Sequence, residues 1–390
     1  MTTPSLTWDD ARLLYPGLRD VAYLDSAAMG LLSTRVRDAM TAMVDAHHLM
    51  GVASSPDWHA DVAATRASIA HLVGGRPDGV AFTQNTSTGL AIVANGLDWR
   101  DGDNLVVPAG EFPSNFYPWL QLRRRGVEVR EIAMADGAAA VADIVGAVDR
   151  RTRVVALSAV QYSSGHRYDL AAVGQACADS GTLLVVDGTQ AVGAMVVDTG
   201  ALGVDVLAVS SHKWVLGPLG VGFVHLSVRA MEQLTPSTVG WLSVEEPFAF
   251  DHEPRLAADA RRFESGTENA VGMAGLGATV ALMHELGPQR IEDRVLDLAD
   301  ELGALLPSVG LTRVASPDRS QRSGIVIARQ VDGSGRLLSD LHQRLLDGGV
   351  RCSLRATGLR FAPHYFVTAA DLARVIDVLR WSRRAVSRRG

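Results

Sequence analysis

Lysine, cysteine and long apolar runs are all scarce in this chain of 390 residues. The two cysteines, Cys177 and Cys352, are too few and too far apart for a disulfide framework or a cysteine-rich metal site. No apolar run approaches the roughly 18 residues that span a bilayer, and the N-terminus lacks the pattern of a signal peptide. The formal net charge of -6 argues against nucleic-acid binding, which needs a clustered basic face. We therefore expect a cytoplasmic protein without a metal site and without membrane or nucleic-acid partners.

Among these scarcities, the shortage of lysine says most about function, because Lys213 is the only lysine among the 37 lysine and arginine residues. A GC-rich genome replaces surface lysine by arginine at little cost, and the abundance of alanine, valine and glycine fits such a bias. A lysine that survives this pressure is expected where arginine cannot work. Arginine forms no Schiff base and is never deprotonated in a protein, so the count predicts a chemical role for Lys213.

The middle of the chain alternates short apolar runs with stretches of helical pattern. This alternation predicts an α/β fold with a mostly parallel sheet that is covered by helices on both faces, and ligands of such sheets bind at the carboxyl ends of the strands. The expected strands are residues 80–83, 104–108, 127–132, 154–158, 183–187, 206–210 and 222–226. The expected helices between them are residues 88–96, 117–125, 141–148 and 169–180.

After Arg262 the pattern changes to long helices and a few short strands. Further helices are expected at residues 271–286, 288–306, 335–348 and 368–380, and further strands at 324–329, 350–354 and 359–362. We therefore expect two domains. The large α/β domain would hold residues 19–261 and a seven-stranded sheet, and a smaller α+β domain would hold residues 1–18 and 262–390.

Two residues at expected strand ends suit the chemistry of pyridoxal 5′-phosphate (PLP). The segment Ser-Ser-His-Lys at 210–213 follows a strand, so the lone lysine lies just beyond a sheet edge, where it could form a Schiff base and then move protons at Cα. Asp187 ends the strand at 183–187, where a carboxylate can pair with the protonated pyridine nitrogen. Taken alone, Asp187 is equally well explained as a turn former before Gly188.

Two more segments would complete such a site. The segment Asn-Thr-Ser-Thr-Gly at 85–89 lies between a strand and a helix, and N–H groups and hydroxyls at a helix N-terminus bind phosphate, although a plain N-cap has the same pattern. The segment Glu-Phe-Pro-Ser-Asn at 111–115 follows another strand and could lay Phe112 flat on a ring. A core phenylalanine is the commoner explanation of any single Phe.

In chain order these motifs resemble the class V aminotransferase superfamily of fold-type I, the cysteine-desulfurase-like PLP enzymes. The resemblance covers nearly the whole chain from residue 23 onward. Its most specific motifs are Asp-Gly-Thr-Gln (187–190), Ser-Ser-His-Lys (210–213), Gly-Pro with a second glycine (217, 218 and 220) and Arg-Phe-Glu-Ser-Gly-Thr (262–267). The resemblance implies the fold-type I PLP-dependent transferase fold, PLP as the cofactor and a small-molecule amino-acid substrate.

The resemblance also implies how the cofactor is bound. Lys213 would carry PLP as a Schiff base, Asp187 would pair with the pyridinium nitrogen, and Gln190 would hydrogen-bond the phenolic oxygen. The residues implied to bind the phosphate within one subunit are Thr86, Ser87, Ser210 and His212.

Three further positions carry expectations from the resemblance. Thr267 would reach the phosphate of a neighbouring subunit, which implies a homodimer with shared sites. Phe112 falls where many relatives place a stacking histidine, and kynureninase-like and isopenicillin N epimerase-like branches have phenylalanine there. Arg360 falls at the arginine that binds the substrate α-carboxylate, a role that suits a planar guanidinium fork.

Other polar residues are expected near the site without an assigned role. They lie on the loop at 160–168 and on the segment that leads to Arg360. These residues are Gln161, His166, Arg167, Arg351 and Arg355.

Two departures from the desulfurase pattern bear on the reaction. Desulfurases carry a nucleophilic cysteine on a mobile loop shortly before the carboxylate arginine, and here residues 351–360 are too short for such a loop. We interpret Cys352 as a small buried hydrophobe within a strand. Ala159 stands where desulfurases commonly have an asparagine. A strict persulfide-forming cysteine desulfurase is therefore not the favoured interpretation.

The favoured interpretation is a C–S β-lyase that acts on a cysteine S-conjugate or a similar β-substituted amino acid. Decarboxylating or oxidative deamination, aminotransfer and epimerisation of the same kind of substrate remain alternatives, because they differ only in which bond of the substrate is broken. A nucleotide-binding oxidoreductase would lack its glycine-rich fingerprint and leave the lone lysine unexplained. An inactive relative is disfavoured by the retained lysine, aspartate and phosphate-site residues.

Overall fold

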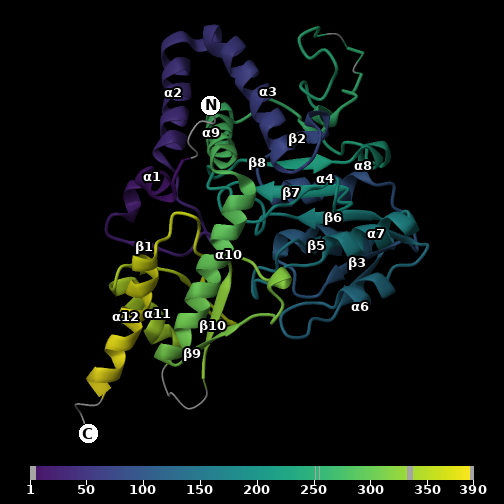
Figure 1. Cartoon of the computed structure of the whole chain (residues 1–390). Helices are drawn as coiled ribbons and strands as arrows, with labels where there is room; N and C mark the ends of the chain where they lie inside the picture. Colours follow the sequence, from purple (N-terminus) through teal and green to yellow (C-terminus); the bar gives the residue numbers. More distant parts are fainter. Residues whose placement is uncertain (1–5, 251, 254, 332–336, 387–390) are drawn as a thin grey trace.

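A seven-stranded sheet forms the centre of the larger part of the molecule in the computed structural model, which describes residues 6–250, 252–253, 255–331 and 337–386 (Figure 1). The strand order is β2-β8-β7-β6-β5-β3-β4. The strands are β2 (Val80–Thr83), β3 (Asn104–Pro108), β4 (Glu128–Ile132), β5 (Thr152–Ser158), β6 (Leu183–Asp187), β7 (Val206–Ser210) and β8 (Gly222–Leu226). Strand β8 is antiparallel to both neighbours and every other pairing is parallel, which confirms the expected mostly parallel sheet.

Two separate cores lie on the two faces of this sheet. Successive side chains of a strand point to opposite faces, and on β6 Val185 enters one core whereas Leu184 and Val186 enter the other. The helices of the first core are α4 (Thr86–Gly96), α5 (Tyr117–Leu120) and α8 (Val228–Gln233). The second core includes α6 (Val141–Gly146) and α7 (Leu170–Ser180), and it continues into helices nearer both ends of the chain. The α/β fold with helices on both faces is thereby confirmed.

The direction of the central strands decides where a ligand can bind. Strands β5, β6 and β7 are adjacent and parallel, so their carboxyl ends lie at one edge of the sheet. Ser158, Asp187 and Ser210 are the last residues of these three strands. This edge therefore brings together Asp187 and Ser210, which the sequence singled out, with Ser158, which it did not.

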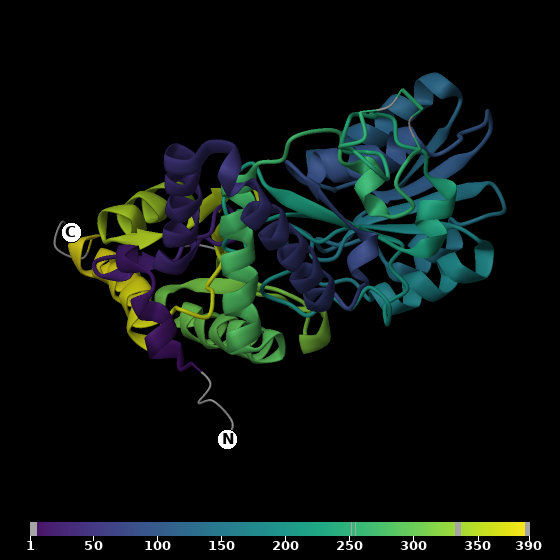
Figure 2. The same cartoon turned by 90° about the horizontal axis from the view of Figure 1, so that it is seen from above.

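A second group of elements lies beside the large sheet (Figures 1 and 2). Strands β9 (Leu311–Val314), β10 (Val326–Gln330), β12 (Ser353–Arg355) and β13 (Gly358–Phe361) form an antiparallel sheet of order β12-β13-β10-β9. Strands β1 (Ala22–Tyr23) and β11 (Val350–Arg351) form a short parallel pair. The helices of this part are α1 (Trp8–Leu13), α10 (Pro288–Leu305), α11 (Leu338–Asp347) and α12 (Ala369–Val386). The division into residues 19–261 against 1–18 and 262–390 stays a prediction.

Two long helices were not expected from the sequence. Helices α2 (Thr34–Met50) and α3 (Ser55–Leu72) form a projecting pair that packs against α9 (Ala270–Leu286) (Figure 1). Val36 is the only fully buried residue of α2, although apolar residues recur at helical spacing along it at Ala39, Met40 and Met43.

Smaller differences concern element ends. The helix expected at 117–125 is α5 followed by a 3₁₀ helix, Gln121–Arg125, and the strand expected at 350–354 is divided at Cys352 into β11 and β12. The start of the helix expected at 335–348 lies outside the described residues, and α11 begins at Leu338.

No single helix of the described residues has both the length and the apolar character needed to cross a membrane. The bent pair Ala270–Leu286 and Pro288–Val309 meets these criteria only when its two helices, which are set at 81°, are taken together.

Candidate active site

Lys213 lies in a tight turn that follows β7 and is fixed from two sides. The amide of Gly30 donates a hydrogen bond of 2.7 Å to the carbonyl oxygen of His212. A Cβ atom at Gly30 would lie 2.3 Å from the carbonyl oxygen of Lys213, so only glycine permits this approach. The buried His364 bonds the next carbonyl oxygen, that of Trp214, through Nε2 at 2.9 Å. The backbone that carries the lysine is thus held in one position.

The amine of Lys213 has no hydrogen bond or ion pair with any of the described residues. Its Nζ lies 5.1 Å from the ring centroid of Phe112. Burial lowers its pKa, the charge of Asp187 opposes this, and the charges of Arg360 and Arg355 lower the pKa further. A lowered pKa favours the neutral, nucleophilic amine. The structure therefore brings Lys213, Phe112, Asp187 and Arg360 into one site.

Asp187 is a buried carboxylate at the end of β6. The amide of Thr189 donates a hydrogen bond of 2.9 Å to its Oδ1. Burial raises its pKa, whereas the hydrogen bonds from Thr189 and the charge of Lys213 lower it. A buried carboxylate at this position suits a cationic group of a ligand, because a partner of opposite charge offsets the cost of burial.

The N-terminus of α4 meets the end of β7 through a cluster of hydroxyl groups. The amide and the hydroxyl of Thr86 both lie 2.8 Å from the Oγ of Ser210. Thr189 bonds the same pair, at 2.5 Å from the hydroxyl of Thr86 and 3.2 Å from the amide of Ser210. Sequence analysis assigned no role to Thr189, although it lies inside a motif that was recognised.

Two further residues of the expected phosphate site flank this cluster. The hydroxyl of Ser87 donates a hydrogen bond of 2.8 Å to Ser114, which follows Phe112 by two residues. His212 is half-buried, and burial lowers the pKa of its imidazole. Their contacts with a phosphate stay a prediction.

Gln190 lies beside the lysine turn and is oriented by two hydrogen bonds. Its Nε2 donates to the carbonyl oxygen of Ala27 at 3.0 Å, and its Oε1 accepts from Trp214 Nε1 at 2.8 Å. One N–H of the amide is left over from these contacts, because an amide nitrogen carries two hydrogens. This N–H is the group that a cofactor oxygen could use.

Arg360 on β13 is a buried guanidinium with unused donors. Its side chain is 2% exposed, its Nη1 donates to the carbonyl oxygen of Tyr162 at 3.3 Å, and its Nη2 lies 3.7 Å from Asp25 Oδ1. Neither Nε nor Nη2 has a hydrogen-bond partner among the described residues. Burial lowers its pKa to about 10, which leaves it cationic at neutral pH. Buried, unpaired N–H groups are costly, and a bidentate carboxylate would satisfy them.

The residues that the sequence left open fall into two groups. Arg167 lies 2.6 Å from Glu292, and Arg351 bonds the carbonyl oxygen of Leu346 at 2.9 Å, so both serve packing within the fold. Arg355 differs, because the pairing of β12 with β13 places it on the same face as Arg360.

The other two residues lie on the loop that follows β5. Gln161 donates from Nε2 to the carbonyl oxygen of Gly110 at 2.5 Å, which ties this loop to the segment before Phe112. The ring of His166 packs edge-on against Tyr168. Neither of them is directed at Lys213 by these contacts.

Cys352 is buried, and burial raises the pKa of its thiol to about 12. A thiol in this state is protonated at neutral pH and is a poor nucleophile. The interpretation of Cys352 as a packing residue agrees with this environment.

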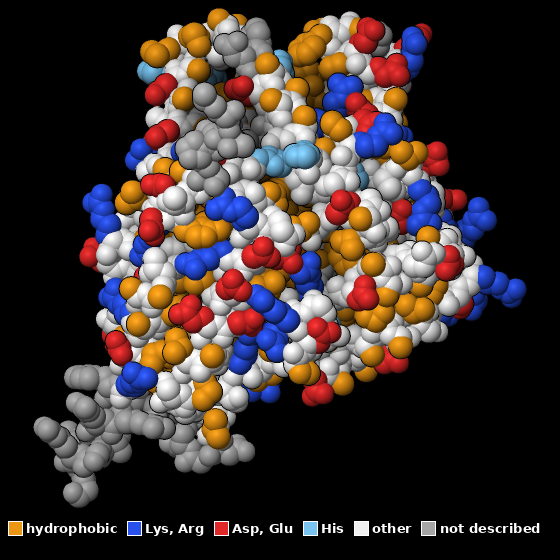
Figure 3. Space-filling view, viewed as in Figure 1, with side chains coloured by type: hydrophobic (Ala, Val, Ile, Leu, Met, Phe, Trp, Pro, Cys, Tyr) orange, Lys and Arg blue, Asp and Glu red, His pale blue; other side chains and the backbone are white. Residues whose placement is uncertain are grey.

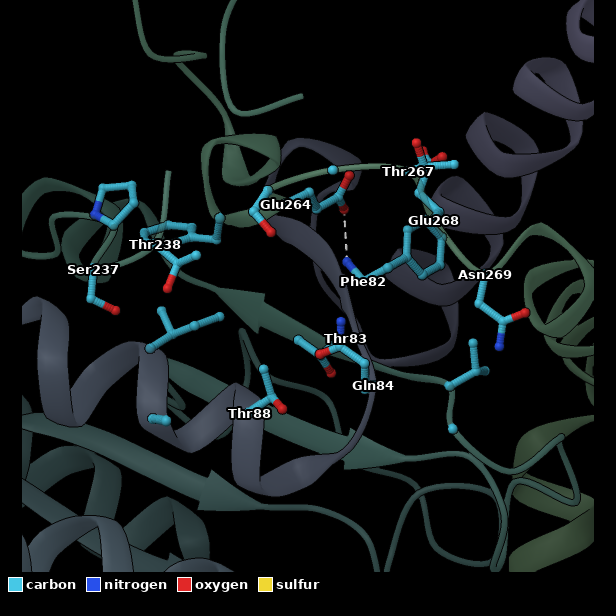
Figure 4. A pocket seen from close by; sticks show the side chains of 18 of the residues that line it. Phe82, Thr83, Gln84, Thr88, Ser237, Thr238, Glu264, Thr267, Glu268 and Asn269 are labelled. Atoms are coloured by element: carbon cyan, nitrogen blue, oxygen red, sulfur yellow. Dashed lines mark hydrogen bonds between the residues drawn. The ribbon is translucent and has the colours of Figure 1, made fainter. Parts of the chain in front are cut away.

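A surface pocket of about 480 Å³ opens along the side of α4, from Thr88 to Asn95. Figure 4 shows Thr88 on α4 at one side of it and Thr267, on the segment that follows the 3₁₀ helix Ala260–Phe263, at the other. Thr267 is exposed to solvent, and the hydrogen bonds of the hydroxyl cluster join Thr86, Thr189 and Ser210 without it. Its expected role across a subunit boundary stays a prediction.

The residues present fit PLP. An unpaired lysine amine, a buried carboxylate and hydroxyls at a helix N-terminus lie around one edge of the sheet, and a ring that stacks on Phe112 would lie against the lysine. These are the groups that hold an aldehyde, a pyridinium nitrogen and a phosphate.

Comparisons with known proteins agree with this assignment. The family model for aminotransferase class-V matches residues 22–366. A probable cysteine desulfurase of Methanothermobacter thermautotrophicus is 35% identical over 314 residues, which cover 77% of this chain and 76% of the relative. Isopenicillin N epimerase of Streptomyces clavuligerus is 28% identical over 331 residues, which cover 80% of this chain and 82% of the relative.

Solved structures share the fold. A C-DES variant with glycine covalently linked to its PLP cofactor has a TM-score of 0.87 at 24% identity, over 94% of this chain and 98% of the other. The apo cysteine desulfurase of Thermococcus onnurineus has a TM-score of 0.85 at 22% identity, over 99% of both chains. The chain belongs to the aminotransferase class-V family and is a PLP-dependent enzyme.

Proposed function

We propose that this enzyme is a C–S β-lyase that acts on a cysteine S-conjugate or a similar β-substituted α-amino acid. The observation that carries the proposal is that one site combines an unengaged lysine amine with a buried arginine, of which two nitrogen atoms have no hydrogen-bond partner among the described residues, while burial raises the pKa of the Cys352 thiol. PLP, when bound, withdraws electrons from the substrate Cα.

Each residue of the site has a definite task in this proposal. Lys213 holds the cofactor and then removes the proton from Cα of the substrate. Asp187 faces the ring nitrogen and keeps it protonated. Arg360 binds the α-carboxylate, which fixes the direction of the Cα–H bond towards Lys213. The bond from Cβ to sulfur then breaks, and the thiolate leaves.

Cys352 separates this proposal from a strict desulfurase. A persulfide-forming enzyme needs a thiolate that reaches the sulfur of the substrate, and a buried thiol with a raised pKa does not supply one. Among the solved structures with this fold is the cystine C–S lyase C-DES in complex with its product, cysteine persulfide. That chemistry fits a site without a reactive cysteine.

Arg355 makes the proposed substrate more specific. It is an exposed cation on the same face of the β12–β13 hairpin as Arg360, and its charge acts on Lys213. A substrate whose leaving group carries its own carboxylate would therefore be favoured over a neutral one. Epimerisation, aminotransfer and decarboxylating or oxidative deamination are the competing reactions of the same site.

Product analysis tests the reaction. Incubation with cystine and with neutral cysteine S-conjugates should release one pyruvate and one ammonium for each thiol or persulfide formed, as β-elimination followed by hydrolysis requires. Mass spectrometry in deuterated water should follow both the products and the recovered substrate. Exchange or inversion at Cα without pyruvate would replace the lyase by an epimerase, and release of CO₂ would indicate decarboxylation.

We also propose that two chains form a homodimer in which Thr267 of each reaches the phosphate site of the other. Thr267 is exposed at the rim of an open pocket. Large apolar side chains are also exposed at the end of α2, in the 3₁₀ helix Gly51–Ser54 that follows it, and on the segment that ends at Phe250. Figure 3 shows hydrophobic side chains among charged ones along the upper edge of the molecule. The exposed apolar side chains include Leu49 (77% exposed), Val52 (88%), Phe248 (60%) and Phe250 (75%).

The cytoplasmic location of the protein stays a prediction.

Mixed dimers should reveal the shared site. Thr267→Ala should weaken PLP binding about 10-fold, the worth of a hydrogen bond to a charged group, whereas Thr238→Ala in the same pocket should not. In a dimer of one Thr267→Ala chain and one Lys213→Ala chain, the only lysine-bearing site receives an intact threonine across the interface. Its PLP affinity should therefore equal that of the wild type. A weakened site in this mixed dimer, or an active monomer in sedimentation, would refute the proposal.

A further inference from the structure

Glu111 is a buried carboxyl group without a cationic partner among the described residues. It follows β3, is 7% exposed, and accepts hydrogen bonds from the amide of Ser158 at 2.7 Å and from its hydroxyl at 2.5 Å. The other two buried glutamates are both paired, Glu264 with Arg66 and Glu292 with Arg167. Burial of an unpaired carboxyl group is costly, so its position requires an explanation.

Glu111 is linked to the strand end that carries Asp187 through Ser158. Ser158, which bonds both oxygens of Glu111, ends β5 and is in register with Asp187 on β6. The amide of Ala159 bonds the carbonyl oxygen of Asp187 at 2.9 Å, which fixes the two strand ends against each other. The charge of Asp187 acts on Glu111. Two buried carboxyl groups are therefore placed next to each other at the end of the sheet.

We propose that Glu111 is a positioning residue that acts through Asp187, so that the protonated ring nitrogen of PLP is stabilised by two buried carboxyl groups instead of one. The inference rests on the proposed function, in which Asp187 faces the ring nitrogen. A cation at that point offsets the repulsion between the carboxyl groups and the cost of their burial. The hydrogen bonds from Ser158 fix the carboxyl group of Glu111 close enough for its charge to act on Asp187. Asp187 remains the direct partner of the ring nitrogen.

The ionisation of Glu111 gives the pair a dependence on pH. Burial raises its pKa to about 7, opposed by the bonds from Ser158 and increased by the charge of Asp187. Tyr168 also faces Glu111, but its own pKa is raised to about 12 and it stays neutral. A cationic ring nitrogen favours the ionised form of Glu111. The contribution of Glu111 to cofactor binding should therefore be present above pH 7 and lost as the pH falls below it.

The test compares two cofactors that differ in one atom. PLP and its analogue with carbon in place of the ring nitrogen are titrated into the full-length chain from which cofactor has been removed. Glu111→Gln keeps the shape and an acceptor for Ser158, and should weaken PLP about 10-fold at pH 8, as expected for loss of a charge near a buried cation. It should leave the affinity for the carbon analogue within about 2-fold. Glu292→Gln, at an equally buried glutamate away from Lys213, should change neither affinity.

The outcomes separate this inference from the proposed function. An equal loss for both cofactors, or no loss for either, overturns the role of Glu111. If Asp187→Asn also fails to discriminate between the cofactors, the assignment of Asp187 is wrong as well. Ser158→Ala supplies an independent measurement, because it removes only the hydroxyl that lowers the pKa of Glu111. In this variant the pH midpoint of PLP binding should move upward, and an unchanged midpoint would contradict the inference.

Discussion

Lys213→Ala should abolish turnover and the covalent attachment of PLP, with a loss of activity of at least about 100- to 10,000-fold, the usual worth of a general base. The loss should be this large because no other lysine exists in the chain to take over. Borohydride reduction followed by intact-mass analysis should show one pyridoxyl group per wild-type chain. Peptide mapping should place that group on Lys213.

Lys213→Arg is the matched control for this experiment. Arginine retains a positive charge beside Phe112 and Asp187 but forms no Schiff base, so it should be as inactive as alanine. Non-covalent PLP should still bind to both variants, because the hydroxyl cluster at Thr86 and Ser210 is unchanged. A pyridoxyl group on either variant at another residue, with activity retained, would refute the assignment.

Arg360→Ala should weaken the use of substrate about 10- to 100-fold in kcat/KM, since each hydrogen bond between charged groups contributes roughly 1.5–3 kcal/mol. The loss should fall mainly on the amino-acid substrate, because the buried guanidinium contacts Tyr162 and Asp25 and is not part of the phosphate site. Titration of PLP into the variant should give the wild-type affinity. A decarboxylated substrate should lose little, since it has no carboxylate for Arg360 to bind.

Cys352→Ser is the control that separates a lyase from a desulfurase. Cys352 is buried with a protonated thiol, so the substitution should leave activity within a few-fold. Loss of turnover in this variant, together with a persulfide on the wild-type chain, would replace the lyase by a desulfurase. Full activity of both Arg360→Ala and Cys352→Ser would show that the C-terminal segment is assigned wrongly.

Local patterns in the sequence were sufficient to predict the strands of the large sheet. Its strands are short apolar runs bounded by turns, and a fully buried parallel strand has that pattern whatever surrounds it. The expected bounds of β2, β3, β6, β7 and β8 agree with the structure. Helices α2 and α3 were not foreseen, although α2 has apolar residues at helical spacing, and both helices pack against α9.

The composition alone pointed to Lys213, because a single lysine in a chain rich in arginine is expected where arginine cannot function. Asp187 was singled out by its place at the end of a buried strand together with the family resemblance, and not by composition. Tertiary structure decided what these residues meet. Arg360 is separated from Lys213 by more than a hundred residues, and the packing of β13 against the loop after β5 leaves its Nε and Nη2 buried without a hydrogen-bond partner among the described residues.

Glu111 shows most clearly that the sequence alone does not determine the surroundings of a side chain. In the sequence it is one acidic residue after a strand, and nothing local distinguishes it from a solvated carboxylate. Its burial, its two bonds from Ser158 and its link through Ser158 to the strand end of Asp187 depend on the order of β3, β5 and β6 in the sheet. The identities of the reactive groups are thus set by the sequence. Their charges and partners are set by tertiary packing, because desolvation and nearby charges act through space.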